Sequence, residues 1–337
     1  MSFKRFDPED FVVSSDSITS TLWSTGAPEL TQFFTSSVQE AGSSGDYYLA
    51  IYQTSSLLTS ATPQFEIAYA DIMGSGSVDY NSAVIGRSPS LTSYGQYRTL
   101  ILEDENSSFT FGSSTNILTA THYWVVNIGR AQYKESLFPG SLNLKLSGSN
   151  GIINLTDDSQ DNPVNRFLGS SRVFQLISGS NGTAGSLANS GFVESSGSYG
   201  LVFPDLGTIL INPDAVSQSI HVDTLRNSST NDNNPRILLN AMELGAGFKL
   251  NSQETISSDY IFVRSRNSEF NYSENPSFIS GSTGEVIYDE FINHPQVYAT
   301  TVGMYNDSNE LLAVAKLSRP LLKDFTKESL VRVKLDF

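Results

Sequence analysis

The sequence predicts an all-β fold, mainly antiparallel, with β-sandwich-like domains and one or two short helices. Three observations support this class. Short runs rich in β-branched and aromatic residues recur at intervals of about 8–12 residues, with Gly, Asn and Ser between them. Only 16% of the residues are charged, and neutral polar residues and glycine take their place. Hydrophobic residues make up 39% of the chain and aromatic residues 11%, which is enough for a sizeable core.

The first two thirds of the chain contain most of the predicted strands. Apolar and polar residues alternate in many of them, as in a strand with one buried face. One pair of strands is joined by Asn150-Gly151, a dipeptide typical of primed hairpin turns. The predicted strands here are 46–54, 64–72, 96–104, 107–112, 123–133, 141–148, 151–157, 172–180 and 198–213.

Three segments are candidates for the short helices: 28–39, 212–220 and 235–248. Their apolar residues recur at helical rather than strand spacing. Pro28 suits the first turn of a helix, and Asn212 is a good N-terminal cap. Gly245 or Gly247 is expected to end the third helix.

The C-terminal part returns to strand patterns, at 259–273, 285–291, 296–306, 310–318 and 329–337. The last strand places four apolar residues on one face: Val331, Val333, Leu335 and Phe337. Pro320 is expected to break the chain before this strand, which then forms the third strand of a meander in its own domain. The alternative is that a partner chain's sheet holds the strand.

These patterns divide the chain into four predicted parts. They are an N-terminal arm (1–27), a β-rich domain (28–205), a connecting segment with short helices (206–258) and a C-terminal β-sandwich-like domain (259–337).

Charge and cysteine content exclude several classes of function. The formal net charge of −15 argues against nonspecific nucleic-acid binding. The chain has no cysteine, so it has no disulfide and no thiolate metal site, and we expect assembly in a reducing cytoplasm. The opening MSFKRFDPEDFVV lacks the apolar region of a secretory signal, and no apolar run is long enough to span a membrane.

No motif predicts catalysis, a cofactor or a metal site, and we do not expect an enzyme. The histidines, His122, His221 and His294, have no metal-like spacing. Asp157, Ser159 and Asp161 resemble the start of a calcium loop, but the later positions of that pattern are not matched.

Tyrosine-rich strands raise the possibility of sugar stacking. The tyrosines concerned are Tyr47, Tyr48, Tyr52, Tyr69, Tyr94 and Tyr97. The alternative, which we favour, is that they form cross-strand pairs within a sheet.

Several longer stretches carry a family resemblance. They are the opening MSFKRFDPEDFVVSSDSITSTLWS, the block YGQYRTLIL, and VRSRNSEFNYSENPSF followed by residues 300–337. Together they resemble a structural protein of T4-like marine phages, especially cyanophages, over most of the chain. VYATTVGMYNDSNELLAVAKLSRP is also similar to a hairpin module of tail-fibre and baseplate proteins. The resemblance implies a virion protein of the tail or baseplate, with neck or head decoration as a further option, and it transfers no functional residue.

A virion subunit acts through its contacts, and two groups of side chains are candidates. The arm contributes Phe3, Phe6, Phe11 and Trp23, and the loop 267–278 contributes Phe270, Tyr272, Pro276 and Phe278. Aromatic anchors on a proline-stiffened loop are typical of protein interfaces, although both groups can also pack within the chain itself.

The expected partners are other virion structural proteins, in a symmetric homo-oligomer or ring, without nucleic acid or membrane. The expected location is the virion, assembled in the host cytoplasm. The alternative function is a host-surface or glycan-binding module of a tail fibre or adhesin.

Overall fold

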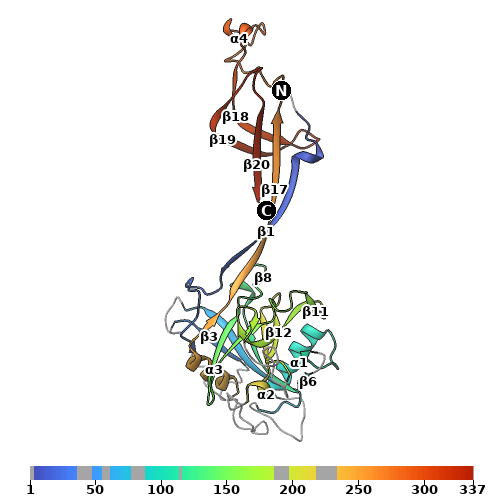
Figure 1. Cartoon of the computed structure of the whole chain (residues 1–337), viewed down its shortest axis with the longest axis vertical. Coiled ribbons are helices and arrows are strands. Elements are labelled where there is room, and N and C mark those ends of the chain that lie inside the picture. The colour runs from blue at the N-terminus through green and yellow to red at the C-terminus, as the bar shows by residue number, and fades with distance from the viewer. Residues whose placement is uncertain are drawn as a thin grey trace. The chain divides into compact units, whose positions relative to one another are not determined.

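The computed structural model describes residues 4–35, 48–54, 61–76, 88–113, 116–185, 197–217 and 234–336. The chain forms two compact units (Figure 1). Unit 1 combines Met1–Ser17 with Thr255–Phe337, and unit 2 is Ile18–Glu254. Strands make up 47% of the structure and the few helices are short, so the predicted all-β class is confirmed. The division into units differs from the predicted domain boundaries after residues 27, 205 and 258.

Unit 2 is built around one large antiparallel sheet. Its strand order is β16-β9-β10-β12-β14-β15-β7-β4-β3-β2, and β11 and β13 pair with β12. The bounds are β2 (Phe34–Thr35), β3 (Tyr48–Tyr52), β4 (Pro63–Asp71), β7 (His122–Asn127), β9 (Asn143–Gly148), β10 (Gly151–Asp157), β11 (Arg166–Leu168), β12 (Ser171–Ser180), β13 (Thr183–Ala184), β14 (Gly200–Phe203), β15 (Thr208–Ile211) and β16 (Phe248–Lys249). A separate ribbon pairs β5 (Thr110–Ser113) with β6 (Asn116–Thr119), and β8 (Ser136–Leu137) pairs with the start of β17 (Asn251–Ser265).

Alternate residues of the sheet face two different cores. Ile67 of β4 lies in one core with Met242 of helix α3 (Asn234–Gly245). The next residue, Ala68, lies in the other core with Tyr94 of helix α1 (Pro89–Leu102). Helices α3 and α1 therefore cover opposite faces of the sheet.

The segment 96–104, predicted as a strand, lies mostly within helix α1, so that prediction is wrong. Pro89 occupies the first turn, where a missing backbone N–H breaks no hydrogen bond. The buried positions recur at helical spacing, but two of them are serines. They are Pro89, Ser90, Ser93, Tyr94 and Ile101. A search for apolar periodicity does not count serines, and it therefore missed the buried face of this helix.

Two of the three helix candidates are confirmed. Helix α2 (Pro213–Val216) is capped by Asn212, whose side chain accepts a hydrogen bond of 3.1 Å from the Asp214 backbone N–H. Helix α3 ends at Gly245, and Ala246 then adopts a left-handed backbone with a φ of 49°.

The candidate helix 28–39 is wrong over its described part, which contains no helix. Leu30 forms a β-bridge with Phe248, with N–O distances of 2.8 and 2.9 Å, and β2 follows. Burial of Leu30 against the core decides this conformation, because threonine and serine give the segment little helical preference. Residues 36–39 lie outside the described residues.

The hairpin of β9 and β10 is confirmed, but its turn differs from the prediction. Gly148 pairs with Gly151, so the loop residues are Ser149 and Asn150. The positive φ, 105°, falls on Gly151, the first residue of β10. Asn150-Gly151 is therefore not the centre of a primed turn.

Unit 1 contains two small antiparallel sheets. One has the order β1-β17-β20, and the other pairs β18 with β19. The bounds are β1 (Phe11–Thr21), β18 (Val297–Tyr305), β19 (Leu311–Lys323) and β20 (Ser329–Asp336), with a short helix α4 at Glu290–Asn293. Ile261, Met304 and Val333 form the centre of its core.

The final strand is held within unit 1, as expected. β20 pairs with β17 from Ser258↔Asp336 to Ser265↔Ser329. Val331, Val333 and Leu335 face the core; Phe337 lies outside the described residues. The predicted meander is wrong, because β20 pairs with β17 and not with β19.

Pro320 does not end a strand, contrary to the prediction. β19 continues past it, and an irregularity accommodates it: Lys316 pairs with Thr301, and Leu321 pairs with Ala299. Pro320 therefore falls in the stretch of β19 between these two pairs, where its missing N–H breaks no pairing in the ladder.

Two further segments depart from the predictions. The arm, 1–27, is not separate where it is described, because β1 pairs with β17 and Trp23 is buried in unit 2. The predicted strand 285–291 is also wrong: Val286 makes a single bridge with Ile279, and helix α4 begins at Glu290.

Candidate assembly surface

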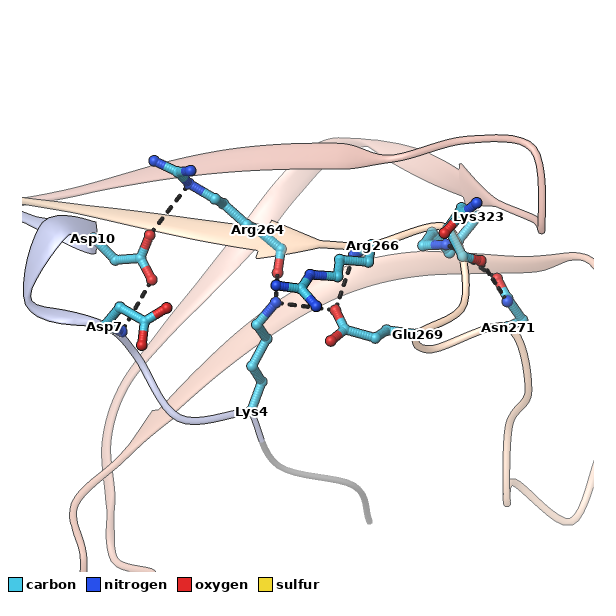
Figure 2. Close-up of polar contacts among 9 residues, drawn as sticks. Lys4, Asp7, Asp10, Arg264, Arg266, Glu269, Asn271 and Lys323 are labelled. Atoms are coloured by element: carbon cyan, nitrogen blue, oxygen red, sulfur yellow. Dashed lines mark hydrogen bonds and ion pairs between the residues drawn. The ribbon is translucent and has the colours of Figure 1, made fainter.

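The N-terminal segment of unit 1 is fastened to the end of β17 (Figure 2). Lys4 Nζ donates 2.8 Å to the Arg264 carbonyl and lies 3.0 Å from the Glu269 carboxylate. Glu269 also accepts a 2.9 Å bond from the Arg266 backbone N–H. That backbone bond and the Lys4 ammonium lower the pKa of the Glu269 carboxyl.

A second contact holds the same segment further along. Asp10 is buried, accepts a 3.1 Å bond from the Asp7 backbone N–H, and lies 3.3 Å from Arg264 Nε. The two contacts fix residues 4–10 against β17, so the start of the chain is part of the structure that supports the neighbouring loop.

The far end of that loop is held by a buried lysine. Lys323, at the end of β19, is 2% exposed. Its ammonium donates to the Asn267 carbonyl (3.1 Å), the Asn271 side-chain oxygen (3.1 Å) and the Asp324 carbonyl (3.2 Å). Three acceptors match the three donors of an ammonium group, so the buried charge is fully hydrogen-bonded. The loop 267–271 is therefore anchored at both ends.

Beyond this anchor, residues 270–296 form the segment that we call the tip. Helix α4 in the tip lies at the far end of unit 1 from the last residues of β20 (Figure 1). Two side chains of the tip pack on each other, with the Phe278 and Phe291 ring centroids 4.2 Å apart. Other large apolar side chains of the tip are exposed: Phe270, Tyr272, Val286, Ile287, Tyr288 and Ile292. Apolar groups gathered on one segment are typical of an interaction site.

The candidate contacts in the loop 267–278 all lie in the tip. Tyr272 is 56% exposed, and Phe270 and Pro276 are also exposed. Phe278 is half-buried, because it packs on Phe291. The structure thus brings these four residues together on one loop, with Phe278 supporting it from within.

The candidate contacts of the arm are divided between the two units. Phe6 packs against the core of unit 1 and makes an edge contact with the exposed Phe11, at a centroid distance of 5.3 Å. Trp23 is buried in unit 2, with its ring 5.0 Å from that of Phe248. Trp23 therefore packs within the chain. Phe3 lies outside the described residues.

Sequence reasoning missed the second half of the tip. The predicted strand 285–291 contains Val286, Ile287 and Tyr288 and ends before Ile292. A signal was present in SGSTGE (280–285), a turn-rich run directly before VIYDEFI. A turn of this kind separates the apolar residues that follow from the preceding loop and favours a compact projecting segment.

The calcium-like acidic cluster has a structural role. Asp157 accepts hydrogen bonds from the backbone N–H groups of Gly140 (2.9 Å) and Ser159 (3.1 Å), and burial raises the pKa of its carboxyl. The buried Asp158 pairs with Arg166 and accepts a 2.8 Å bond from the Gln175 backbone. Among the described residues, no group of His, Asp and Glu has the arrangement of a metal site.

The remaining candidates for chemistry are dispersed. His122 is buried at the start of β7, 3.6 Å from the Asp214 carboxylate, and His294 is exposed. His221 and Tyr47 lie outside the described residues. Tyr69 and Tyr94 are buried, and Tyr97 is sufficiently buried that its pKa is raised to about 12. The tyrosines in the described part of unit 2 therefore do not form one exposed stacking surface.

No helix in the described part of the chain has the length and apolar character needed to cross a membrane. Comparison with protein-family models, curated proteins and solved structures finds no match to this chain.

Proposed function

We propose that the chain is a structural subunit of a tailed-phage virion, of the tail or baseplate, and that it acts by protein–protein assembly. The observation that carries the proposal is the tip: apolar side chains stand exposed on a segment whose base is fixed by the buried Lys323 ammonium. A rigid base limits the entropy lost when exposed anchors bind a neighbour. The sequence resemblance to marine-phage structural proteins supplies the virion context.

The balance of buried and exposed side chains in unit 1 supports the same proposal. Among the described residues, its buried hydrophobic side chains are Ile261, Met304 and Val333, whereas sixteen large apolar side chains are exposed. A monomeric protein rarely leaves so much apolar surface in one region without a partner. We expect assembly to cover the tip and to stabilise unit 1 through binding.

The proposal is tested on purified particles. Mass spectrometry should detect the chain at a fixed ratio to other virion proteins, and a cryo-EM map should show the tip against a neighbouring subunit. In a complementation assay, Tyr272→Ser with Ile292→Ser should reduce incorporation into particles. Phe167→Ser, at an exposed apolar position of unit 2, is the matched control. Absence of the chain from particles would contradict the proposal.

A host-surface or glycan-binding module is the second candidate, and one observation favours it. Tyr272, Tyr288 and Tyr298 are all exposed in the tip or just beyond it, and tyrosine rings stack on sugars. Binding of the isolated chain to a glycan array, lost in Tyr288→Ser but kept in Tyr48→Ser, would favour this function over assembly. Neck or head decoration remains a further option for the location of an assembly subunit.

A further inference from the structure

The outward side of the β18–β19 hairpin carries a second apolar surface. Met304, Ala313 and Ala315 of this hairpin pack against the core of unit 1. Because side chains alternate along a strand, the residues between them face outward. A register shift between Met304 and Tyr305 pairs Tyr305 with Leu311 and leaves both Leu311 and Leu312 exposed. We call this surface the hairpin face; it consists of Thr301, Gly303, Tyr305, Leu311, Leu312, Val314 and Lys316.

The centre of the hairpin face is apolar. Leu312 is 69% exposed and Val314 is 59% exposed. Gly303, opposite Val314, has no side chain, and the Tyr305 ring lies against it: a Cβ at Gly303 would be 3.0 Å from Tyr305 Cε2 and 3.5 Å from Leu311 Cδ1. Glycine weakens a strand interior unless something approaches its backbone closely. Here the Tyr305 ring approaches the Gly303 backbone closely. The ring thereby extends the apolar surface from β19 onto β18.

Charges mark the two ends of this surface with opposite signs. Between residues 297 and 322 the charged residues are two acids, Asp307 and Glu310, and two cations, Lys316 and Arg319. The acids lie at the turn of the hairpin, and the cations lie at the other end of the apolar centre. All four side chains are exposed, and none of them forms a salt bridge within the described part of the chain.

The geometry points to a second copy of this chain as the occupant of the hairpin face, in a two-fold contact with the two hairpins antiparallel. This orientation places Lys316 and Arg319 of each copy against Asp307 and Glu310 of the other, with the apolar centres between them. A parallel contact would place acids on acids and cations on cations. A face that is complementary to itself when rotated is the requirement for a two-fold, isologous interface. The inference rests on the proposed assembly function and names one of its contacts.

The size of the face sets the expected strength. On its longer side, from Leu311 to Lys316 of β19, the face spans about 20 Å at ~3.3 Å per residue. One hairpin face is smaller than the ~800 Å² per partner of a standard interface, so we expect a weak dimer in solution. In a particle, contacts elsewhere on the chain raise the effective concentration and reinforce it.

The test exchanges the charges. One variant makes the face entirely acidic (Lys316→Glu with Arg319→Glu), and another makes it entirely basic (Asp307→Lys with Glu310→Lys). Analytical ultracentrifugation of the full chain, at up to roughly 1 mM because a small interface is weak, should show a wild-type dimer. Each variant alone should dimerise at least about tenfold more weakly, since like charges then face each other. An equimolar mixture of the two, and the variant with all four changes, should recover dimerisation.

An apolar pair supplies the matched control. Val314→Ser should weaken the dimer, whereas Val164→Ser, at a 73% exposed position of unit 2, should not. Thermal unfolding checks that every variant is folded. The inference is overturned by a wild-type monomer at all concentrations, by charge variants that dimerise like wild type, or by a folded four-change variant that stays monomeric. If the chain is monomeric but present in particles, the dimer contact is overturned and the proposed function stands. If the chain dimerises but is absent from particles, the proposed function is overturned and the dimer contact stands.

Discussion

Replacing Val333 by alanine removes two methyl groups from the small core of unit 1. Val333 lies in β20 and is buried with Ile261 and Met304. Burial of each carbon group contributes ~0.8 kcal/mol, and the cavity that remains adds to the loss, so the expected cost is about 2 kcal/mol. Few other side chains are buried in this core, and therefore little of the cavity can be refilled by neighbours.

Hydrogen exchange of β17 amides measures this cost locally. Residues Ser258–Ser265 of β17 pair with β20, and their amides exchange when that pairing opens. A loss of about 2 kcal/mol corresponds to roughly 30-fold faster exchange, since ~1.4 kcal/mol is a factor of ten. The amides of β4 and β7 in unit 2 should exchange at the wild-type rate, because local openings of the two units are separate cooperative events.

The control uses the same substitution at an exposed site of the same unit. Val13→Ala in β1 should change exchange by less than about threefold, because surface substitutions usually cost under ~0.5 kcal/mol. Suppose instead that Val333→Ala leaves exchange in β17 unchanged and only reduces incorporation into particles. The final strand would then belong to the sheet of a neighbouring subunit, and the reasoning from its own core would be refuted.

Four further substitutions follow from the geometry of unit 2. Gly200→Ala would place a Cβ 1.8 Å from the Leu210 carbonyl oxygen, at a backbone φ of 152°, and should lower the urea midpoint of unfolding strongly. Gly95→Ala in helix α1 has open space around it and should raise the free energy of unfolding by up to ~1 kcal/mol. Asp158→Ala removes the buried acceptor of the Gln175 backbone N–H, whereas the partly exposed Arg166 guanidinium can turn to water, and it should cost about 2 kcal/mol in urea unfolding. Burial raises the pKa of Asp157 above 3.8, so the folded state holds this proton more tightly than the unfolded state. Compared with Asp157→Asn, wild type should therefore lose stability as the pH rises from 3.8 through the folded pKa; a constant difference in urea midpoints across that range would contradict this.

Local patterns in the sequence predicted the strands whose partners are close along the chain. The hairpin of β9 and β10 follows from two alternating segments separated by a short polar turn. The faces of β20 follow from its strict alternation, because one side of the strand meets a core. Such features depend on the residues of one segment, and a single sequence contains that information.

Other features depend on contacts between distant segments and could not be predicted in this way. Leu30 is held by a bridge to Phe248, more than two hundred residues away, and this contact overrides a helix-like pattern. The buried Lys323 has the sequence signature of an ordinary surface lysine, and only the approach of Asn267 and Asn271 makes its burial possible. The sequence therefore predicted the aromatic residues of the first half of the tip, and missed both its second half and the groups that hold the loop.

Unit 1 is built from two segments that are far apart in the sequence, and this predicts the order in which the two units fold. Met1–Ser17 and Thr255–Phe337 are separated by the whole of unit 2. Joining such distant segments carries a large loop-closure entropy, and this entropy is smaller once unit 2 has folded and fixed part of the intervening chain. We therefore expect unit 2 to fold first.

Pulse-labelling hydrogen exchange during refolding checks this order. The amides of β4 and β7, which pair within the unit 2 sheet, should become protected before those of β17 and β20. A Trp124→Phe variant, which perturbs the buried core of unit 2, should delay both sets; Leu330→Ala, at an exposed position of β20, should delay neither. Protection of the β17–β20 pair before β4 and β7 would show that the C-terminal strands form their sheet independently, and that the first seventeen residues join unit 1 as a late addition to it.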